Sequence, residues 1–146
     1  MTGTVFVDTN VLVYARDADA GDKEARAMDW LARLWRDQNG RISYQVLQEY
    51  YVTVTQKLRP GLPAVDARRD VVSFFAWNPT VSNDGIMRRG WELQDEFGLS
   101  WWDSLIAAAA LELGCAYLIS EDFRHGLTID GLTVVNPFQA THEDLA

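Results

Sequence analysis

Apolar residues in this chain fall into short continuous runs and into longer stretches with helical spacing. The runs at 5–7, 117–119 and 132–135 are short and almost wholly apolar, as in strands that are buried on both faces of a sheet. Between residues 23 and 38 the apolar positions recur every three or four residues, which predicts an amphipathic helix. Strands that alternate with helices along the chain predict an α/β fold, with a parallel β-sheet of about four or five strands flanked by helices on both faces.

Glycine, proline and capping residues divide the rest of the chain into further elements. We predict a strand at 41–43 and an edge strand at 76–81, where Pro79 cannot donate to a central ladder. Further helices are predicted just after the first strand and at 44–58, 64–75, 83–97 and 102–114. The expected N-caps are Asp22, Ser43 and either Ser82 or Asn83, and the expected helix ends are Asn39-Gly40 and Gly98.

Four carboxylates lie where predicted strands end or near the start of predicted helices: Asp8, Glu49, Asp103 and Asp122. In an open α/β sheet the carboxyl ends of parallel strands face one crevice, which is where ligands bind. Carboxylates gathered there would repel one another unless a divalent cation held them together. The pattern therefore predicts a metal-dependent site of the kind that cleaves phosphodiesters.

Each of these carboxylates also has a purely structural interpretation. Asp8, Asp103 and Asp122 could cap a helix or a turn, because side-chain oxygens accept hydrogen bonds from free backbone N–H groups. Glu49 could be a solvated helix residue, although its apolar neighbours place it at the border of a buried face, where an unpaired carboxylate is unfavourable. All four would have to be structural for the predicted site to vanish.

Four polar residues next to the carboxylates are expected to support the site. Asn10 should orient the first carboxylate or bind a water, because its amide carries no charge. Ser104 offers a hydroxyl, or simply favours the first turn of its helix. Ser120 and Glu121 precede the last carboxylate, and Glu121 is expected to lie at the periphery or to reach the metal through a water.

Composition and charge narrow the class of protein. The 146 residues are 48% hydrophobic and include six Trp, which excludes intrinsic disorder and fits one domain over residues 1–146. We expect a cytoplasmic protein, since no apolar run could span a membrane, no signal-peptide pattern is present and the single cysteine, Cys115, cannot form an internal disulfide.

The net charge of −8 does not favour a nucleic-acid partner, so any RNA would have to be held by local arginines. The candidates are the pairs Arg68-Arg69 and Arg88-Arg89, although both also fit ordinary solvated helix faces.

The residues around the carboxylates resemble the motifs of the PIN-domain nucleases, in particular the VapC-type toxins of bacterial toxin–antitoxin pairs. The resemblance covers nearly the whole chain, and four acids in this order and spacing are highly specific. Its departures are small, because Ser120 stands where many members have Thr and Glu121 is an acid found in only some. The matching segments are Val7 to Tyr14, Ile42 to Tyr50, Trp102 to Ala109, Leu118 to Phe123 and Val134 to Phe138.

The resemblance implies a metal-dependent endoribonuclease in which Asp8, Glu49, Asp103 and Asp122 coordinate Mg²⁺ or Mn²⁺. Such hard cations suit carboxylate and water ligands. It also implies a toxin that forms a homodimer and is blocked by a cognate VapB-like antitoxin, which we expect to bind among the helices at 22–75. An RNA is then the expected substrate.

Three other kinds of protein share some of these sequence features. A catalytically silent PIN-like interaction module would bind a partner without cleaving RNA, and the presence of all four acids argues against it. A phosphatase of the aspartyl-phosphate type needs a second Asp two residues after Asp8, where Asn10 stands. A two-histidine ribonuclease would depend on His125 and His142, which are expected to be surface or capping residues.

Overall fold

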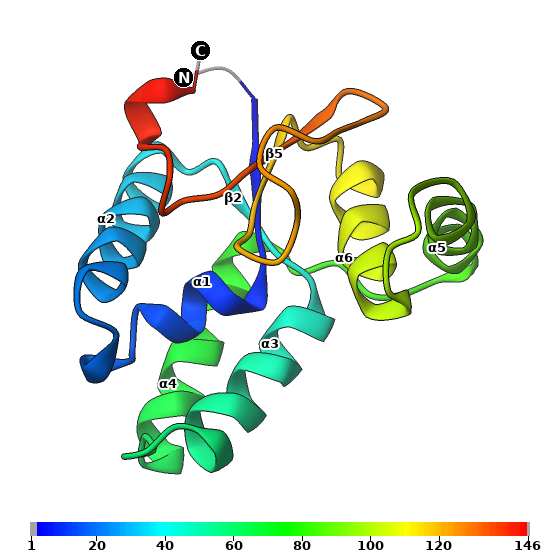
Figure 1. Ribbon diagram of the computed structural model, residues 1–146. Helices are drawn as coiled ribbons and strands as arrows, with labels where there is room; N and C mark the ends of the chain where they lie inside the picture. Colours follow the sequence, from blue (N-terminus) through cyan, green and yellow to red (C-terminus); the bar gives the residue numbers. More distant parts are fainter. Residues whose placement is uncertain (1–2, 146) are drawn as a thin grey trace.

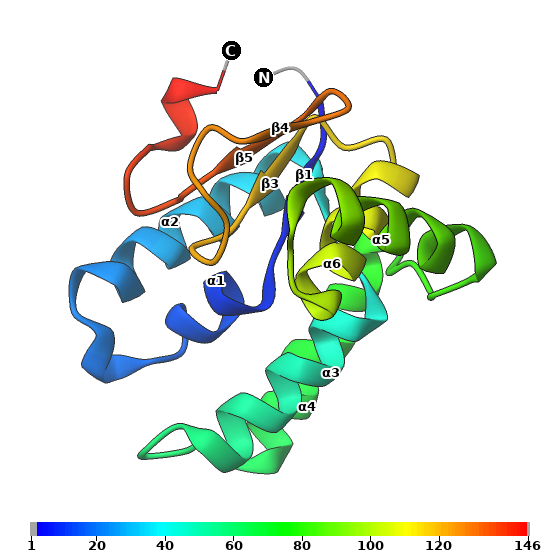
Figure 2. The same cartoon turned by 45° about the vertical axis from the view of Figure 1, so that its right-hand side comes forward.

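The computed structural model describes residues 3–145 as a sheet surrounded by helices. The five strands have the order β2-β1-β3-β5-β4 (Figure 2). The first four in this order are parallel, whereas β4 is antiparallel to β5. The predicted α/β fold with four or five strands is therefore confirmed. The strands are β1 (Val5–Val7), β2 (Gly40–Arg41), β3 (Tyr117–Ile119), β4 (Thr128–Ile129) and β5 (Leu132–Val135).

Helices cover the two sides of the sheet. Figure 1 shows α2 and α6 on opposite sides of the strands, with α5 packed outside α6 and with α3 and α4 projecting together below the sheet. The π-helical turn Thr53–Lys57 continues α3, and three short 3-10 turns are Ala18–Ala20, Phe75–Trp77 and His142–Asp144. The α-helices are α1 (Thr9–Tyr14), α2 (Asp22–Asp37), α3 (Tyr44–Val52), α4 (Ala64–Phe74), α5 (Asp84–Phe97) and α6 (Trp101–Glu112).

The central strands and α6 form the core of the domain. Every residue of β1 is fully buried, and α6 buries the unbroken run from Ser104 to Ala110. The alanines of α6 allow its neighbours to pack closely against it. Gly90 of α5 lies against the Trp101 ring, where an added Cβ would be 3.1 Å from the ring. Cys115 is buried. None of the helices described here is long and apolar enough to cross a bilayer.

Most of the predicted helix ends agree with the structure. Ser43 caps α3, where its hydroxyl accepts a hydrogen bond from the N–H of Val46 at 3.3 Å. Asn83 caps α5 in the same way, and Gly98 ends that helix with a φ of 67°. Asp22, however, is the first residue of α2 rather than its cap, because Gly21 occupies the cap position.

Two turns differ from the sequence expectations. Gln38, with a φ of 56°, adopts the left-handed conformation expected of Asn39-Gly40, and Gly40 lies in β2 instead. A side chain at Gly40 would meet the Trp77 ring at 2.5 Å, so the glycine is required there by packing. Left-handed geometry at one residue is enough to end a helix.

The edge strand predicted at 76–81 is wrong. Phe75–Trp77 forms a 3-10 turn, Asn78 has a φ of 51°, and only Thr80 makes an isolated bridge, to Ser43. Left-handed backbone followed by proline cannot extend a strand, so the chain crosses the edge without joining the ladder.

The hairpin of β4 and β5 was not predicted. Its turn residues Asp130 and Gly131 have φ of 47° and 88°, which is the geometry that Asp-Gly favours between antiparallel strands. His142 also differs from expectation: it is only 4% exposed and packs edge-on against Trp30, with ring centroids 5.7 Å apart.

Candidate metal centre

Three of the four predicted carboxylates come together at the carboxyl edge of the sheet. Asp8, Asp103 and Asp122 each bring one oxygen into a group in which all lie within 4.8 Å of one another. Asp8 directly follows β1, and Asp122 lies in the loop after β3, the strand that pairs with β1 in parallel. Asp8 is buried, Asp103 half-buried and Asp122 exposed. The group is therefore closed off from solvent at Asp8 and open to solvent at Asp122.

Asp8 is held in place by donors on both of its oxygens. The Ser120 hydroxyl donates to Oδ2 at 2.7 Å, and the backbone N–H of Thr9 donates to Oδ1 at 2.7 Å. The second bond makes Asp8 the N-cap of α1 as well. The structural interpretation of Asp8 as a helix cap is therefore confirmed, and the capping bond also fixes the position of its carboxylate.

Asn10 joins the loops that follow β1 and β3. Its amide nitrogen lies 3.2 Å from Oγ of Ser120 and 3.2 Å from Oδ2 of Asp122. Its carbonyl oxygen accepts from the backbone N–H of Glu121 at 3.2 Å. The same amide is 3.4 Å from Asp8 Oδ2, a long contact. The expectation that Asn10 would contact Asp8 is consistent with this arrangement, but its shorter contacts go to the neighbouring loop.

The third carboxylate is delivered by the first turn of α6. Ser100 caps this helix, because its hydroxyl accepts from the N–H of Asp103 at 3.1 Å. Asp103 is therefore not the cap, and its side chain is available to the group. The Ser104 hydroxyl donates to the Ser100 carbonyl oxygen at 2.8 Å, so this buried serine braces the helix start.

Glu49 lies beside the three-carboxylate group and not within it. Its Oε2 accepts from the Thr9 hydroxyl at 2.8 Å, and its Oε1 accepts from the Gln45 amide at 2.9 Å. Thr9 thus bonds Asp8 through its backbone and Glu49 through its side chain. Neither supporting residue was singled out from the sequence, although Gln45 stands four positions before Glu49, which puts both on one helix face.

Glu121 turns away from the group. Its carboxylate accepts a hydrogen bond from the Tyr14 hydroxyl at 2.6 Å and forms an ion pair with Lys23. Partial burial pushes the pKa of Glu121 upward, but the hydrogen bonds from Lys23 and Tyr14 outweigh it and lower the pKa overall. The peripheral place expected for Glu121 agrees with this contact pattern, and its charge is compensated by Lys23.

The electrostatics of the group favour a cation. Burial raises the pKa of Asp8 from 3.8 to about 7, against the opposing hydrogen bonds from Ser120 and Thr9. The charges of Asp122 and Asp103 act in the same direction as burial. The pKa of Asp103 is raised as well, by burial first and then by the charges of Asp122 and Glu49. Carboxylates that lie this close together are stabilised by a divalent ion that prefers oxygen ligands, so Asp8, Asp103 and Asp122 fit Mg²⁺ or Mn²⁺.

The arginine pairs predicted as RNA contacts mostly have partners within the chain. Arg69 lies 3.4 Å from Asp66, and Arg89 pairs with Glu92 at 2.7 Å. Lys57, in contrast, makes no ion pair among residues 3–145. It lines a pocket of about 380 Å³ together with Thr9 and Glu49, the residue that lies beside the carboxylate group.

One sequence model of a protein family matches most of the chain. The sequence model of the PIN domain family matches residues 5–127. None of the curated proteins compared with the chain matches it.

Several solved structures share the fold. A toxin–antitoxin complex from Klebsiella pneumoniae has a TM-score of 0.64 and 20% identity, covering 92% of this chain and 98% of that chain. VapBC2 from Rickettsia felis, bound to a DNA fragment from its promoter, has a TM-score of 0.56 and 18% identity, covering 90% and 96%. VapC20 from Mycobacterium tuberculosis, a sarcin-ricin loop cleaving toxin, has a TM-score of 0.55 and 19% identity, covering 82% and 92%.

Proposed function

Because the chain belongs to the PIN domain family, we propose that it is a metal-dependent endoribonuclease and the toxin of a type II, VapBC-like toxin–antitoxin pair. The observation that carries this proposal is the group of three carboxylate oxygens within 4.8 Å at the carboxyl edge of the sheet. The likeness in fold to a toxin–antitoxin complex and to a toxin that cleaves the sarcin-ricin loop supports the toxin assignment and RNA as the substrate.

We assign the metal ligands to Asp8, Asp103 and Asp122, with Mg²⁺ or Mn²⁺ as the ion. When bound, the cation supplies Lewis-acid activation of a water and neutralises charge that develops on the phosphate. The chain's own part is to hold these carboxylates in position. Ser120 and the N–H of Thr9 fix both oxygens of Asp8, so the carboxylate does not have to reorganise when it binds.

Glu49 and Lys57 act at the margin of the site in this proposal. Glu49, held by Thr9 and Gln45, can accept a proton or a hydrogen bond from water at the mouth of the group. Lys57 lines the adjacent pocket and offers a cation to an RNA phosphate. One well-placed cation matters in a chain of net charge −8, because that net charge repels RNA.

The direct test is cleavage of a structured RNA with Mg²⁺ or with EDTA. We expect Asp8→Asn, Asp103→Asn and Asp122→Asn to lower the cleavage rate by at least about 100-fold, since each removes an anionic ligand. Glu96→Gln is the matched control, because Glu96 is exposed on α5 outside the group. Full activity in EDTA, or in two of the three Asp variants, would contradict the proposal.

The antitoxin is assigned to an apolar groove of about 590 Å³ between α3 and α4. Exposed apolar side chains line it, among them Val72 at 61% and Phe75 at 45% exposure. This groove lies within the expected region of helices at 22–75. Large exposed apolar patches are typical of protein interfaces. As in the VapC-type toxins that the sequence resembles, we also expect a homodimer.

Coexpression with the product of any short reading frame found next to the gene tests the groove. Val72→Asp should abolish co-purification of the two proteins, because it places a charge in an apolar interface. Val65→Asp is the matched control, since Val65 is also 61% exposed and lies on α4 but does not line the groove. Equal co-purification of both variants would move the antitoxin to another surface.

A further inference from the structure

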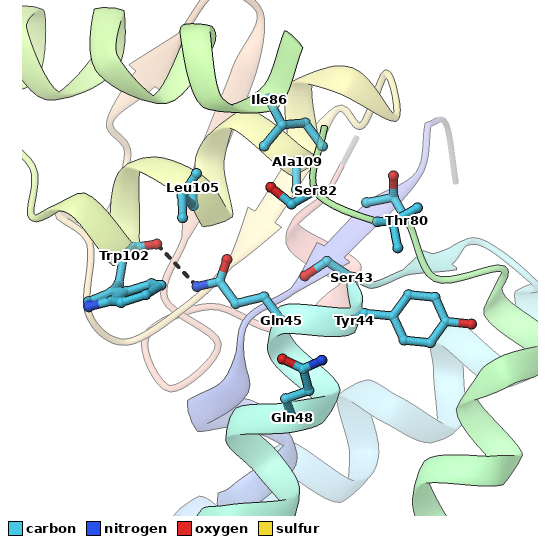
Figure 3. A pocket seen from close by; sticks show the side chains of 11 residues that line it. Ser43, Tyr44, Gln45, Gln48, Thr80, Ser82, Ile86, Trp102, Leu105 and Ala109 are labelled. Atoms are coloured by element: carbon cyan, nitrogen blue, oxygen red, sulfur yellow. Dashed lines mark hydrogen bonds between the residues drawn. The ribbon is translucent and has the colours of Figure 1, made fainter. Parts of the chain in front are cut away.

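A second pocket opens beside the carboxylate group, between the start of α3, the start of α6 and the segment 80–86. Figure 3 shows its walls, with Gln45 and Gln48 from α3 facing Trp102 and Leu105 from α6. The cavity measures about 380 Å³ and is open to solvent on one side. Its size suits a small ring system with part of the chain that carries it.

The lining of this pocket combines apolar surface with neutral polar groups. Leu105 and Ile86 provide apolar walls, while Gln48, Thr80 and Ser82 provide amide and hydroxyl groups. Among residues 3–145, no charged side chain lines the cavity. A phosphate or a carboxylate would find no counter-charge there, so the lining favours an uncharged ligand that has both hydrogen-bond donors and acceptors.

Trp102 lines this pocket and is the most exposed tryptophan among residues 3–145, with 62% of its surface accessible. It lies in the first turn of α6, directly before Asp103. An indole of this exposure is unfavourable in water, and a flat ligand that covers it would bury a large apolar area.

Gln45 connects the pocket to the site chemistry. Its amide nitrogen donates to Glu49 Oε1 at 2.9 Å and lies 3.5 Å from the Trp102 carbonyl oxygen (Figure 3). The amide oxygen of Gln45 then remains as an acceptor in the pocket. Gln48, one turn further along α3, makes no side-chain hydrogen bond among residues 3–145 and offers a donor and an acceptor.

We propose, on the basis of the function proposed above, that this pocket takes one unstacked nucleobase of the RNA strand being cleaved. Trp102 stacks on the face of the base, and the Gln45 and Gln48 amides bind its edge. Single-stranded RNA is recognised in this way, because its bases can be splayed out onto aromatic side chains and hydrogen-bonded at their edges. The pocket thereby sets which nucleotide lies next to the scissile phosphate.

The test measures binding separately from cleavage. Fluorescein-labelled single-stranded RNAs of each base composition and an RNA duplex are titrated with protein in Ca²⁺, and the anisotropy is followed while gels verify that the RNA is intact. We expect Trp102→Ala to weaken single-strand binding by about five- to 100-fold, the loss of one stacked base, and to leave duplex binding unchanged. Trp102→Phe keeps an aromatic face and should retain most of the affinity. The salt dependence of binding should be the same in all three proteins, because no phosphate contact is changed.

Matched variants separate this pocket from general effects. Trp91→Ala removes another exposed tryptophan, 50% accessible and outside the pocket, and should bind RNA as the wild type does. Gln48→Ala should reduce the difference in affinity among the four base compositions. Thermal unfolding of every variant verifies that it is folded. If Trp102→Ala does not fold, Trp102→Phe and Gln48→Ala still test the pocket.

Three results would overturn the nucleobase pocket. One is wild-type affinity and an unchanged cleavage pattern in Trp102→Ala and Gln48→Ala while the wild type cleaves RNA in Mg²⁺, which would leave the proposed function intact. Another is dissociation of a dimer or loss of antitoxin binding in Trp102→Ala with unchanged RNA affinity, which would make the pocket a protein interface. Absence of any RNA binding and cleavage by the wild type would remove the pocket and the proposed function together.

Discussion

The hydroxyl of Ser120 donates a 2.7 Å hydrogen bond to Oδ2 of Asp8, across 112 residues of sequence. Both residues are almost wholly buried, at 0% and 4% exposure, and they follow neighbouring parallel strands. The bond therefore links Asp8 to the residue that follows the neighbouring strand, so the position of this carboxylate depends on the pairing of β1 with β3. Any change that loosens it should act on stability and on cation binding together.

Ser120→Ala tests this coupling. The variant leaves Oδ2 of a buried carboxylate without its shortest donor, and loss of such a bond costs about 1–3 kcal/mol in the free energy of unfolding. We expect a lower Tm and weaker Mn²⁺ binding, measured by calorimetric unfolding and titration. Ser120→Thr is the control, because it keeps a hydroxyl at the position, and it should restore most of both. Unchanged Mn²⁺ affinity in Ser120→Ala would show that the bond is only structural.

Asp8→Asn tests the raised pKa of the buried carboxyl. In the metal-free protein the pKa is about 7 in the folded state and 3.8 is its usual value, so the unfolded chain ionises first as the pH rises. The contribution of Asp8 to the free energy of unfolding therefore falls by at most about 4 kcal/mol as the pH rises from 3.8 to 7. It stays at the lower value above pH 7. In EDTA, Asp8→Asn should raise the Tm more at pH 8 than at pH 4.

Adding Mn²⁺ should reverse that comparison, because the cation stabilises the ionised carboxylate of the wild type and has one ligand fewer in Asp8→Asn. The measurement is thermal unfolding of both proteins at both pH values, with and without the ion. An Asp8→Asn protein that is less stable than the wild type in EDTA at pH 8 would contradict the raised pKa.

Glu49→Gln tests whether Glu49 acts in cleavage without being a metal ligand. The glutamine can still accept from Thr9 and keeps the shape of the side chain, but it cannot hold a proton as a carboxylate does. We expect the cleavage rate to fall at least about 10-fold while Mn²⁺ affinity changes less than about threefold. Isothermal titration and single-turnover cleavage measure the two quantities. Loss of Mn²⁺ binding as severe as in Asp103→Asn would place Glu49 among the ligands.

Lys57→Gln tests the phosphate contact proposed at the pocket next to Glu49. Removing one such contact should weaken RNA binding for all sequences alike and lower the slope of log affinity against log salt by about one. Arg69→Gln is the matched control, since Arg69 is already paired with Asp66. An identical salt slope for the wild type and Lys57→Gln would exclude Lys57 from the RNA path.

The sequence was sufficient to place Asp8 and Asp122, because each follows an apolar run whose burial on both faces makes it a central strand. Adjacent parallel strands must deliver their carboxyl ends to one edge, so the meeting of these two acids followed from topology. Asp103 was found at a helix start, and only the structure could show that Ser100 caps the helix and leaves Asp103 free.

Other features depend on distances that no local pattern encodes. Lys23 and Glu121 pair across 98 residues, and that pair decides that Glu121 faces away from the carboxylate group. The hydroxyl of Thr9 takes Glu49 as its acceptor across 40 residues, which holds Glu49 beside the group. These contacts depend on how α1, α2 and α3 pack around the sheet edge, and helical periodicity gives the buried face of each helix but not its partner.

The most direct test of the metal site is an anomalous difference map from a crystal soaked in Mn²⁺. We expect a single strong peak bounded by the carboxylates of Asp8, Asp103 and Asp122, at metal–oxygen distances of about 2.0–2.3 Å, and no such peak in Asp103→Asn crystals. Absence of a peak at this group in the wild type, or a peak that persists there in Asp103→Asn, would contradict it.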